Sequence, residues 1–522
     1  MLINKPLNRN NIYLFGLILL AIGIPLSNFL MSISQIILFA NWLFDKNILN
    51  KIKAFFANKP ALIFSSIFLL HLIGLFYTSD FNYAFKDLRT KIPIILLPLI
   101  ISTSPIIDGK KFRLILSFFV GSVLFASIAC YYTYLTQKFN DIRQISIFIS
   151  HIRFSLDICL AICILFYFIF KDFQLSITQK WLVSLLLFWL VYFLFILQSF
   201  SGIFILFILF ILLLVYIIIS LKKWTYKFIA LFLLIALSLS VFIYLQNTIH
   251  TYFRVKKENT ANLEQYTPRG NLYCHDSISY GIENGNYIGL YVCSDELKSA
   301  WEERSKINID STDKMGQIIS YTLTRFLNSK GLRKDADGVK ALSDVEIKSI
   351  ENGCSNTIYL QNSGLKARIY KVLFEYSSFT ITGNTRGYSI FQRFELWKAA
   401  IGIIKNNFWF GVGTGDMVSI YDKQLKEMKS DLANQKLRAH NQYLSIFSAL
   451  GLVGFLVFMF ALICPAFLNH SFKDFCFVCF FIIICLSMIN EDTIESQAGV
   501  TFFAFFYSFL VLSKKIIPSL KQ

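Results

Sequence analysis

Charged residues are scarce in this sequence. They make up 16% of its 522 residues, whereas about a quarter of a typical soluble chain is charged. Hydrophobic residues make up 55%, aromatic residues 17%, and Phe alone occurs 55 times. This composition excludes a soluble multidomain enzyme and a fibrous or disordered protein, and it predicts a chain that lies mostly in lipid.

Acidic residues are fewer than basic ones, so the formal net charge is +18. In a chain embedded in a membrane, an excess of Lys and Arg reflects the topology of the chain and its contact with anionic lipid. We therefore expect membrane lipids, and no nucleic acid, as partners of this charge.

The sequence also has little with which to build a disulfide framework or a metal site. Seven of its ten Cys, including the CxxC pair Cys476 and Cys479, lie in apolar runs, where Cys acts as a small hydrophobic residue. Cys274, Cys293 and Cys354 lie in a polar region. A disulfide between Cys274 and Cys293 is possible there and would leave Cys354 unpaired. The six His are scattered and no DxD-like cluster lies near the predicted outer face, so no metal or other cofactor is predicted.

Twelve apolar runs between charged breaks are candidate membrane spans. They start near residues 12, 29, 60, 92, 114, 153, 181, 202, 226, 440, 474 and 498. A span needs about 20 apolar residues, and fewer where neighbouring helices bury it. No small-residue cleavage site follows the first run, so we expect a retained helix and not a removed signal. The sequence predicts an all-α polytopic membrane protein with about 12 transmembrane helices.

Basic residues fix the predicted orientation. With the N-terminus in the cytoplasm, the inner segments hold eighteen Lys and Arg, whereas the short outer loops hold only Lys86, Arg89, Lys91, Lys138 and Arg143. This bias predicts that both termini are cytoplasmic. It divides the chain into nine helices over residues 1–245, an outer domain over 246–437 and three helices over 438–522. The outer stretch has apolar residues at helical spacing and Gly- and Asn-rich turns, so we expect a folded, mainly helical domain.

Three places on the predicted outer face hold polar groups that burial in lipid would penalise. At the outer start of the sixth span, His151 and Arg153 are followed one turn deeper by Asp157. Arg153 can reach back to the interface and pair with Asp157. A cation on the outer rim runs against the charge bias, however, so a binding role for Arg153 is an equal alternative.

The second place closes the predicted outer domain. Ser389, Arg393, Trp397 and Ala400 share one stripe of a predicted helix, and a GVGTGD run follows. Arg393 is either a surface charge of ordinary packing or a binding group. No strand precedes the glycines, so we interpret them as a tight turn back to the membrane and not as a nucleotide cradle, with Asp416 as a cap or hydrogen-bond acceptor.

The third place opens the tenth span and is the strongest constellation in the sequence. Its polar residues stand where the chain passes from water into lipid: Arg438, His440, Asn441 and Tyr443. An isolated His at a membrane edge is more often a hydrogen-bonded structural residue than a catalyst, but this one has an Arg two positions before it and an amide directly after it. On the loop after the eleventh span, Glu491, Asp492 and Glu495 could bind sugar hydroxyls, although we expect a solvated loop.

In this order, the motifs resemble the O-antigen ligase family of polytopic bacterial membrane proteins, which includes related polysaccharide polymerases. The resemblance rests on RAHNQYL followed by GLVG, on the stripe around Arg393 that leads to FGVGTGD, and on the large outer segment between the ninth and tenth spans. DLRTKIPIILLP (87–98), SHIRFSLD, GLRKD (331–335) and NEDTIESQAGVTFF (490–503) are similar to variants of the family in Bacteroidetes. The resemblance covers most of the chain and indicates the superfamily, but not one acceptor.

The resemblance implies a metal-independent glycosyltransferase at the periplasmic face of the inner membrane. The donor would be a glycan on undecaprenyl diphosphate, the acceptor a hydroxyl of a lipid A-core sugar, and the anomeric configuration would invert. The roles known in the family make His440 the catalytic base, and imidazole, with an ordinary pKa of about 6.5, suits a neutral base. The same roles place Arg393 and Arg438 at the lipid diphosphate. We also assign three neighbours to substrate binding: Asn441, Tyr443 and Asp416.

One position departs from the family pattern. Many members have Ser-Arg-x-Gly at the outer start of the eighth span, where this chain has Ser199, Phe200, Ser201 and Gly202. Because the Arg is absent, either Arg153 supplies the missing cation in space or the diphosphate is bound differently.

Three alternatives stay open. A polymerase would use the same donor with a second lipid-linked repeat as acceptor, and a protein O-oligosaccharyltransferase would use Ser or Thr of an exported protein. A non-enzymatic lipid-linked glycan carrier would need charged residues within several spans and internal symmetry, neither of which we find in the sequence.

Overall fold

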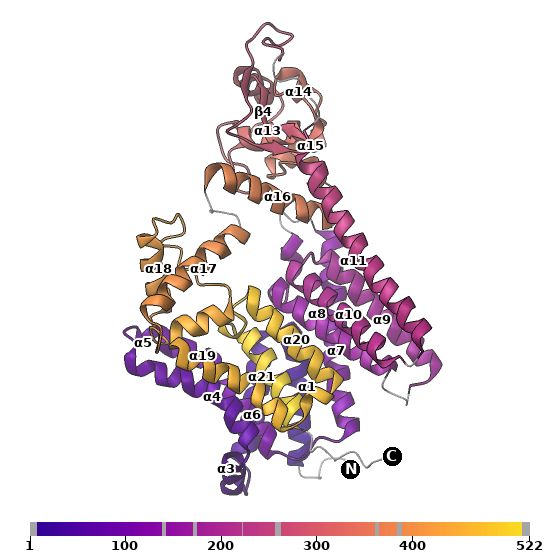
Figure 1. Cartoon of the computed structure of the whole chain (residues 1–522), viewed down its shortest axis with the longest axis vertical. Coiled ribbons are helices and arrows are strands. Elements are labelled where there is room, and N and C mark those ends of the chain that lie inside the picture. The colour runs from indigo at the N-terminus through magenta and orange to yellow at the C-terminus, as the bar shows by residue number, and fades with distance from the viewer. Residues whose placement is uncertain are drawn as a thin grey trace, which may run out of the picture. The chain divides into compact units, whose positions relative to one another are not determined.

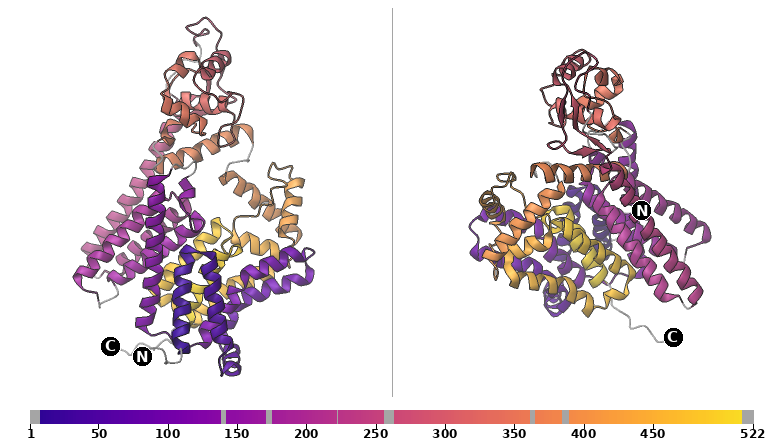
Figure 2. Two further views of the ribbon diagram at one scale, coloured as in Figure 1. Left: turned by 180° about the vertical axis from the view of Figure 1, so that it is seen from behind. Right: turned by 45° about the horizontal axis from the view of Figure 1, so that its top comes forward.

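The computed structural model describes residues 8–137, 142–170, 175–221, 223–255, 263–360, 365–383 and 389–513. Over these residues the chain is mostly helical, with four short strands (Figure 1). It forms two compact units, each visible from two further directions in Figure 2. Unit 1 comprises Met1–Gln137, Arg143–Phe210 and Arg393–Gln522, and unit 2 comprises Lys138–Ile142 and Ile211–Gln392. Lys138, one of the predicted outer cations, lies outside the described residues.

The helices of unit 1 bring distant parts of the sequence side by side. Helix α4 packs along α19 and α6 along α21, as the indigo and yellow ribbons of Figure 1 show, while α1 packs on α2 and α7, and α8 on α9 and α20. The chain passes between the units within α10 and α17. The helices are α1 (Arg9–Leu26), α2 (Asn28–Leu43), α3 (Ile48–Ala57), α4 (Lys59–Ile73), η1 (Gly74–Tyr77), α5 (Phe81–Lys91), α6 (Pro93–Thr103), α7 (Gly109–Thr136), η2 (Ile142–Ile145), α8 (His151–Phe170), α9 (Ile177–Ile196), α10 (Phe200–Ser220), α17 (Ser389–Asn406), α18 (Met417–Glu427), α19 (Gln442–Leu468), η4 (Ser471–Lys473), α20 (Phe475–Asn490), η5 (Thr493–Glu495) and α21 (Gln497–Leu512).

Many of these helices begin at a polar residue whose side chain accepts a hydrogen bond from the first turn. The first amides of a helix have no partner within it, so such a cap fixes where the helix begins. The caps are Asn8, Ser27, Asn58, Asp80, Asp108, Ser176, Asn441, Asp474 and Ser496.

Each of the twelve predicted span starts lies within a few residues of a helix start. The described residues include seven helices long and apolar enough to cross a membrane: α1, α4 with η1, α7, α8, α9, α11 (Trp224–Phe253) and α19. Four others are apolar but shorter: α2, residues 200–216 of α10, α20 and α21. Helix α6 has 11 residues, which span about 16 Å, or roughly half of a hydrocarbon core. This pattern agrees with a multi-pass helical membrane protein. The count of twelve crossings, and the boundaries at 245 and 437, stay predictions.

Unit 2 holds most of the predicted outer domain and is mainly helical, but it also has two small two-stranded sheets that the sequence did not predict. Strand β1 (Cys274–Asp276) pairs antiparallel with β4 (Gly289–Val292), and β2 (Ile282–Glu283) with β3 (Asn286–Tyr287). Trp301, Leu323, Phe326 and Val339 belong to the core of this unit. Its helices are α11, α12 (Ser294–Glu302), α13 (Ile319–Lys330), α14 (Ala336–Lys340), α15 (Asp344–Glu351), η3 (Thr357–Tyr359) and α16 (Leu365–Thr382).

The GLRKD segment has a structural role in unit 2. The buried ammonium of Lys334 donates to the carbonyl of Leu290 (3.0 Å) and to Oδ1 of Asn328 (2.8 Å). The carbonyl of Lys334 also accepts from the amide of Cys293. Lys334 therefore ties β4 to α13. The thiols of Cys274 and Cys293 are both free.

Candidate functional site

A glycine-rich loop, residues 408–416, holds the start of α19 at a sharp bend. Gly451 has φ +64° and ψ −169° inside α19, which interrupts the helical hydrogen bonds there. The loop supplies the missing partners, because the amides of Val412 and Gly413 donate to helix carbonyls and the amide of Leu452 donates to the carbonyl of Phe408 (2.8 Å). A Cβ on Gly451 would lie 2.3 Å from the backbone of Trp409 and Phe410. Gly411 of the loop approaches the backbone of Ala449 equally closely, so glycine at both positions allows the loop and α19 to come into backbone contact.

Asp416 ends this loop and anchors a second one. Its two carboxylate oxygens accept from the amides of Ser79 (2.8 Å) and Asp80 (2.9 Å), just before α5. Asp416 is therefore a hydrogen-bond acceptor, as expected, and its donors in the structure are backbone amides. Tyr443, also predicted to bind substrate, donates its hydroxyl to the carbonyl of Cys485 on α20 (3.0 Å).

The backbone of His440 is clamped where α19 begins. His440 has φ +48°, a region that costs energy for a residue with a Cβ. Its amide donates to Oδ2 of Asp492 (3.1 Å), and Oδ1 of the same carboxylate accepts from the hydroxyl of Ser445 (2.6 Å). Asn441 caps α19 by accepting from the amide of Leu444 (3.1 Å). These contacts hold His440 in one orientation.

The side chain of His440 faces an acid and an arginine. It is 42% exposed, and its Nδ1 lies 4.0 Å from Oε2 of Glu491. The other oxygen of Glu491 binds the guanidinium of Arg393 on α17 (2.7 Å). One turn along α17, Nε1 of Trp397 donates to the carbonyl of Ala439 (2.9 Å). The predicted stripe of α17 therefore lies against residues 438–441, which precede α19 and which we call the His440 turn. The side chain of Ser389, also in the predicted stripe, is outside the described residues.

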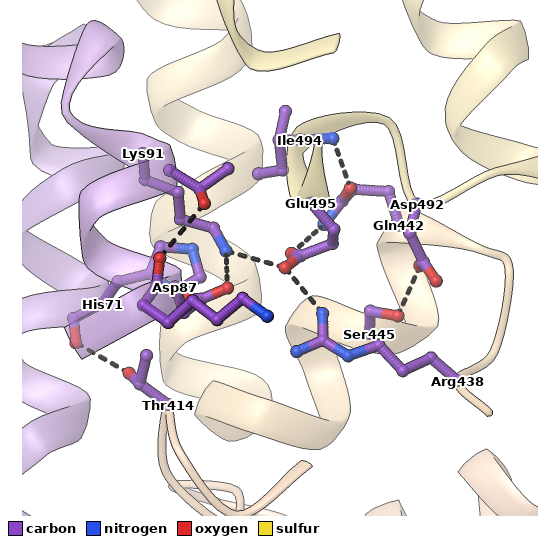
Figure 3. Close-up of polar contacts among 12 residues, drawn as sticks. His71, Asp87, Lys91, Thr414, Arg438, Gln442, Ser445, Asp492, Ile494 and Glu495 are labelled. Carbon is purple, nitrogen blue, oxygen red and sulfur yellow. Dashed lines mark hydrogen bonds and ion pairs between the residues drawn. The ribbon is translucent and has the colours of Figure 1, made fainter. Parts of the chain in front are cut away.

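Arg438 belongs to a buried charge network, which we define as Tyr83, Asp87, Lys91, Arg438, Gln442 and Glu495. Figure 3 labels all of these residues except Tyr83. Glu495 is at its centre, because one of its oxygens accepts from both Arg438 (2.6 Å) and Lys91 (2.8 Å). Lys91 also binds Asp87 (2.6 Å), and Gln442 donates to the second oxygen of Glu495 (3.2 Å). Arg438 additionally contacts the hydroxyl of Tyr83. Arg438 thus faces protein carboxylates in the structure.

The network sets the charge of its two acids differently. Burial raises the pKa of Asp87 from 3.8 to about 7, with nearby Glu495 adding to the effect and Lys91 opposing it. For Glu495, burial alone would raise the pKa, but Lys91 and Arg438 lower it well below its usual range. Glu495 is therefore the ionised partner that holds the two cations, while Asp87 gains a proton readily.

A histidine of α4 adjoins the same network. Nδ1 of His71 lies 3.8 Å from Oδ2 of Asp87, and the carbonyl of His71 accepts from the hydroxyl of Thr414 (2.7 Å). Both ring nitrogens of His71 are buried and have no hydrogen-bond partner among the described residues. His71 therefore connects the network to α4 and to the glycine-rich loop, while Arg438 and Gln442 connect it to the start of α19.

Arg153 contacts the loop of residues 491–495, which we call the acidic loop. One of its terminal nitrogens donates to the carbonyl of Asp492 (3.0 Å), whereas NH1 is buried without a hydrogen-bond partner in the described part of the chain. Two residues on, the hydroxyl of Ser155 accepts from that of Ser199 at the start of α10 (2.9 Å). Arg153 therefore reaches the level at which α10 begins, where Phe200 is 55% exposed.

The prediction that the acids after the eleventh span form a solvated loop is wrong. Glu491 and Asp492 are each 8% exposed, and both bind residues of the His440 turn or α17. The sequence also missed the network partners on α5. Lys91 gave a signal, because it was a cation on the outer face against the charge bias, four positions after an acid.

A comparison with known protein families identifies a related segment of the chain. Residues 358–459 match the family model for O-antigen ligase, which confirms the predicted resemblance. The match includes Arg393, Asp416, Arg438, His440, Asn441 and Tyr443, and leaves Arg153 and the acidic loop outside. It supports a glycosyltransferase of the ligase or polymerase type in lipopolysaccharide biosynthesis. No curated protein matches the chain.

Proposed function

We propose that this chain is an O-antigen ligase-like glycosyltransferase that moves a glycan from undecaprenyl diphosphate to a hydroxyl of a lipid A-core sugar. The reaction takes place at the periplasmic face of the inner membrane. The observation that carries the proposal is the exposed imidazole of His440, whose backbone is clamped and whose side chain faces Glu491 and Arg393 within the matched family segment and the loop beside it.

His440 acts as the base in this proposal. Its Nδ1 side faces Glu491, so Nε2 is the nitrogen left to take the proton of the acceptor hydroxyl. The Glu491 carboxylate stabilises the imidazolium that forms, as an acid partner does for other catalytic histidines. Arg393 orients Glu491 through its 2.7 Å contact.

Arg153 and Arg393 hold the donor diphosphate in this proposal. The unpartnered NH1 of Arg153 offers a buried donor, and Arg393 is only partly covered. A guanidinium suits this task because it stays charged and binds phosphate oxygens with two parallel hydrogen bonds. We assign Arg438 to positioning, because its contacts run to Glu495 and Tyr83, and Asp416 and Tyr443 likewise to holding the loops. Asn441 caps the helix behind His440.

The chemical step is a direct displacement. The acceptor oxygen forms a bond to the anomeric carbon while the bond from that carbon to the diphosphate oxygen breaks. The hydroxyl proton goes to His440, and undecaprenyl diphosphate leaves with its negative charge matched by the two arginines. A single displacement inverts the configuration. The proposal needs no metal, since arginines neutralise the leaving group.

The predicted topology supports a site on one face. The residues that meet here come from around 79–91, 153, 393–445 and 491–495, and the topology places all of these segments at the outer ends of helices. Contacts between these segments require that they share one side of the membrane. The bias of basic residues assigns that side to the periplasm and both termini to the cytoplasm.

The acceptor is the least constrained part of the proposal. A polymerase or a protein O-oligosaccharyltransferase would use the same donor site with another hydroxyl, so each is an alternative outcome of one experiment. A non-enzymatic glycan carrier would not need His440 at all.

The test is deletion of the gene, followed by complementation and gel analysis of the lipopolysaccharide. Loss of all long chains with accumulation of lipid-linked polymer identifies a ligase, and a ladder reduced to a single repeat identifies a polymerase. Unchanged lipopolysaccharide with loss of glycan from exported proteins identifies the protein-directed enzyme.

Two histidine variants complete the experiment. His440→Gln should not complement. His470→Gln is the matched control, because His470 is also exposed and also has a positive φ (+51°) but lies at the opposite end of α19. Full complementation by His440→Gln at normal membrane level would overturn the catalytic assignment.

A further inference from the structure

Helix α3 is too short to cross a membrane and lies at one end of unit 1. Its ten residues give a length of about 15 Å. It follows α2, precedes α4 and packs on α4 and α6. Nε1 of Trp42 donates to Oγ1 of Thr103 (2.8 Å), so α2 and α6 end at the same level. Figure 1 shows α3 protruding beyond α6 at that end of the unit.

One face of α3 is apolar and uncovered. Phe55 is buried against the rest of the unit, whereas Leu49, Ile52 and Phe56 are 71%, 37% and 67% exposed. Their spacing of three and four residues places these three on one stripe of the helix. Phe44, in the turn before α3, is also exposed. A short helix beside the ends of the spans, with an apolar stripe of this kind, fits the boundary between lipid headgroups and acyl chains.

Lysines without partners flank the apolar stripe. Lys46, Lys53 and Lys59 are exposed, and none of them has an ion pair within the described residues. The only acid between residues 44 and 59 is Asp45, which binds Lys51 (2.8 Å) and lies near Arg9 (3.7 Å). Positive charge beside the stripe is therefore left without compensation from the protein.

We propose that α3 is an interfacial helix whose Leu49–Phe56 stripe lies among the acyl chains. Lys53 within α3, Lys46 just before it and Lys59 at the start of α4 bind the headgroups of anionic phospholipids. Charge complementarity selects this occupant, because a zwitterionic surface would accept the apolar stripe but leave the three lysines unmatched. On the predicted topology, the surface is the cytoplasmic leaflet. This role is separate from glycan transfer and does not depend on it.

The first test measures anionic lipid on the full-length protein. Protein is extracted from nanodiscs of phosphatidylcholine with and without phosphatidylglycerol, and bound lipid is counted by native mass spectrometry. Changing Lys46, Lys53 and Lys59 to Gln should lower phosphatidylglycerol binding roughly fivefold per lysine, or on the order of a hundredfold together. The matched control changes three exposed lysines of unit 2 to Gln: Lys306, Lys314 and Lys348. Equal binding by the two triple variants would overturn the proposal.

The second test locates the helix in the bilayer. Phe56→Trp adds one indole to the seven native ones, so its fluorescence is obtained by difference from the parent protein. Lipids brominated near the headgroup should quench it more strongly than lipids brominated near the chain end. Absence of quenching places α3 in water, and stronger quenching by the deep bromines places it in the core. Either result would contradict an interfacial helix.

Discussion

Replacing Glu495 by Gln should lower the stability of the protein far more than replacing an exposed acid such as Asp108. Glu495 contacts two cations, Lys91 at 2.8 Å and Arg438 at 2.6 Å, in a buried setting. At an effective dielectric constant of 20, two charges about 4 Å apart attract by about 4 kcal/mol, so the two contacts together give about 8 kcal/mol before desolvation. The cost of burying the carboxylate offsets part of this. The expected net loss is about 3–5 kcal/mol, as for other buried pairs that lose one partner.

The assay is thermal unfolding of purified protein in one detergent, read as loss of the monodisperse peak on size exclusion. At roughly 1–2 °C per kcal/mol for a chain of this size, Glu495→Gln should melt about 3–10 °C below the wild type. Asp108→Asn is the control, because Asp108 forms an exposed pair with Lys111 and Asn can still cap α7. Equal melting temperatures for both variants would show that Glu495 does not hold Lys91 and Arg438 together.

The pH dependence separates the two acids of the network. The pKa of Asp87 is raised from 3.8 to about 7, so its contribution to stability is complete below about pH 4 and is lost as pH rises through 7. Asp87→Asn should therefore gain on the wild type between pH 5 and pH 8. The pKa of Glu495 is lowered, so its contribution is lost only in acid, and the deficit of Glu495→Gln should stay constant over that range. Parallel curves for both variants would contradict this assignment of charge.

Four further predictions concern the site, the bend, the topology and the absence of a metal requirement. Arg153→Lys keeps the charge but loses the paired hydrogen bonds, so transfer should fall roughly 30- to 1000-fold, corresponding to about 2–4 kcal/mol. Arg89→Lys at matched expression should not change transfer. Near-normal turnover of both Arg153→Lys and Arg153→Ala would remove Arg153 from the site. Gly451→Ala should lower yield and melting temperature, because its Cβ would meet the backbone of Trp409 and Phe410 at 2.3 Å. Gly121→Ala should be tolerated, because its Cβ meets open space. Similar melting temperatures for the two variants would refute the close approach at Gly451. Reporter fusions near Lys298 and Lys366 should be external and one near Lys110 cytoplasmic, and a cytoplasmic signal at Lys298 would overturn the site's placement. Purified protein given lipid-linked donor should retain transfer in EDTA, and activity lost to chelator and restored by Mg²⁺ or Mn²⁺ would show a metal requirement.

Helix starts were predictable because the chain marks them with local chemistry. Asn58 before Lys59, Asp108 before Gly109 and Asn441 before Gln442 each place a capping side chain at the edge of an apolar run. The residues around His440 were identified as a candidate site for a similar reason, since four polar residues cluster at the start of an apolar run. Such signals depend only on neighbours in the sequence.

The buried charge network could not be predicted in this way. Lys91 and Glu495 are 404 residues apart along the chain, and nothing near either one identifies its partner. The acids at 491–495 therefore resembled any charged loop, and a solvated position was the simplest expectation. The two-stranded sheets of unit 2 were missed because strands of two to four residues are too short to establish an alternating pattern.

The distance along the chain between Lys91 and Glu495 also bears on how the protein is made. A chain still emerging from the ribosome inserts α4 and α5 long before the loop with Asp492 and Glu495 exists. Until that loop arrives, Lys91 and Arg438 lack their shared carboxylate, and the amide of His440 lacks the Asp492 oxygen that fixes it. On the proposed mechanism, competence for transfer is therefore acquired only when α20, η5 and α21 have packed against the rest of unit 1. The proposal therefore predicts that a chain arrested or cleaved before residue 490, which lacks these carboxylates, transfers no glycan even where its earlier helices have reached the membrane.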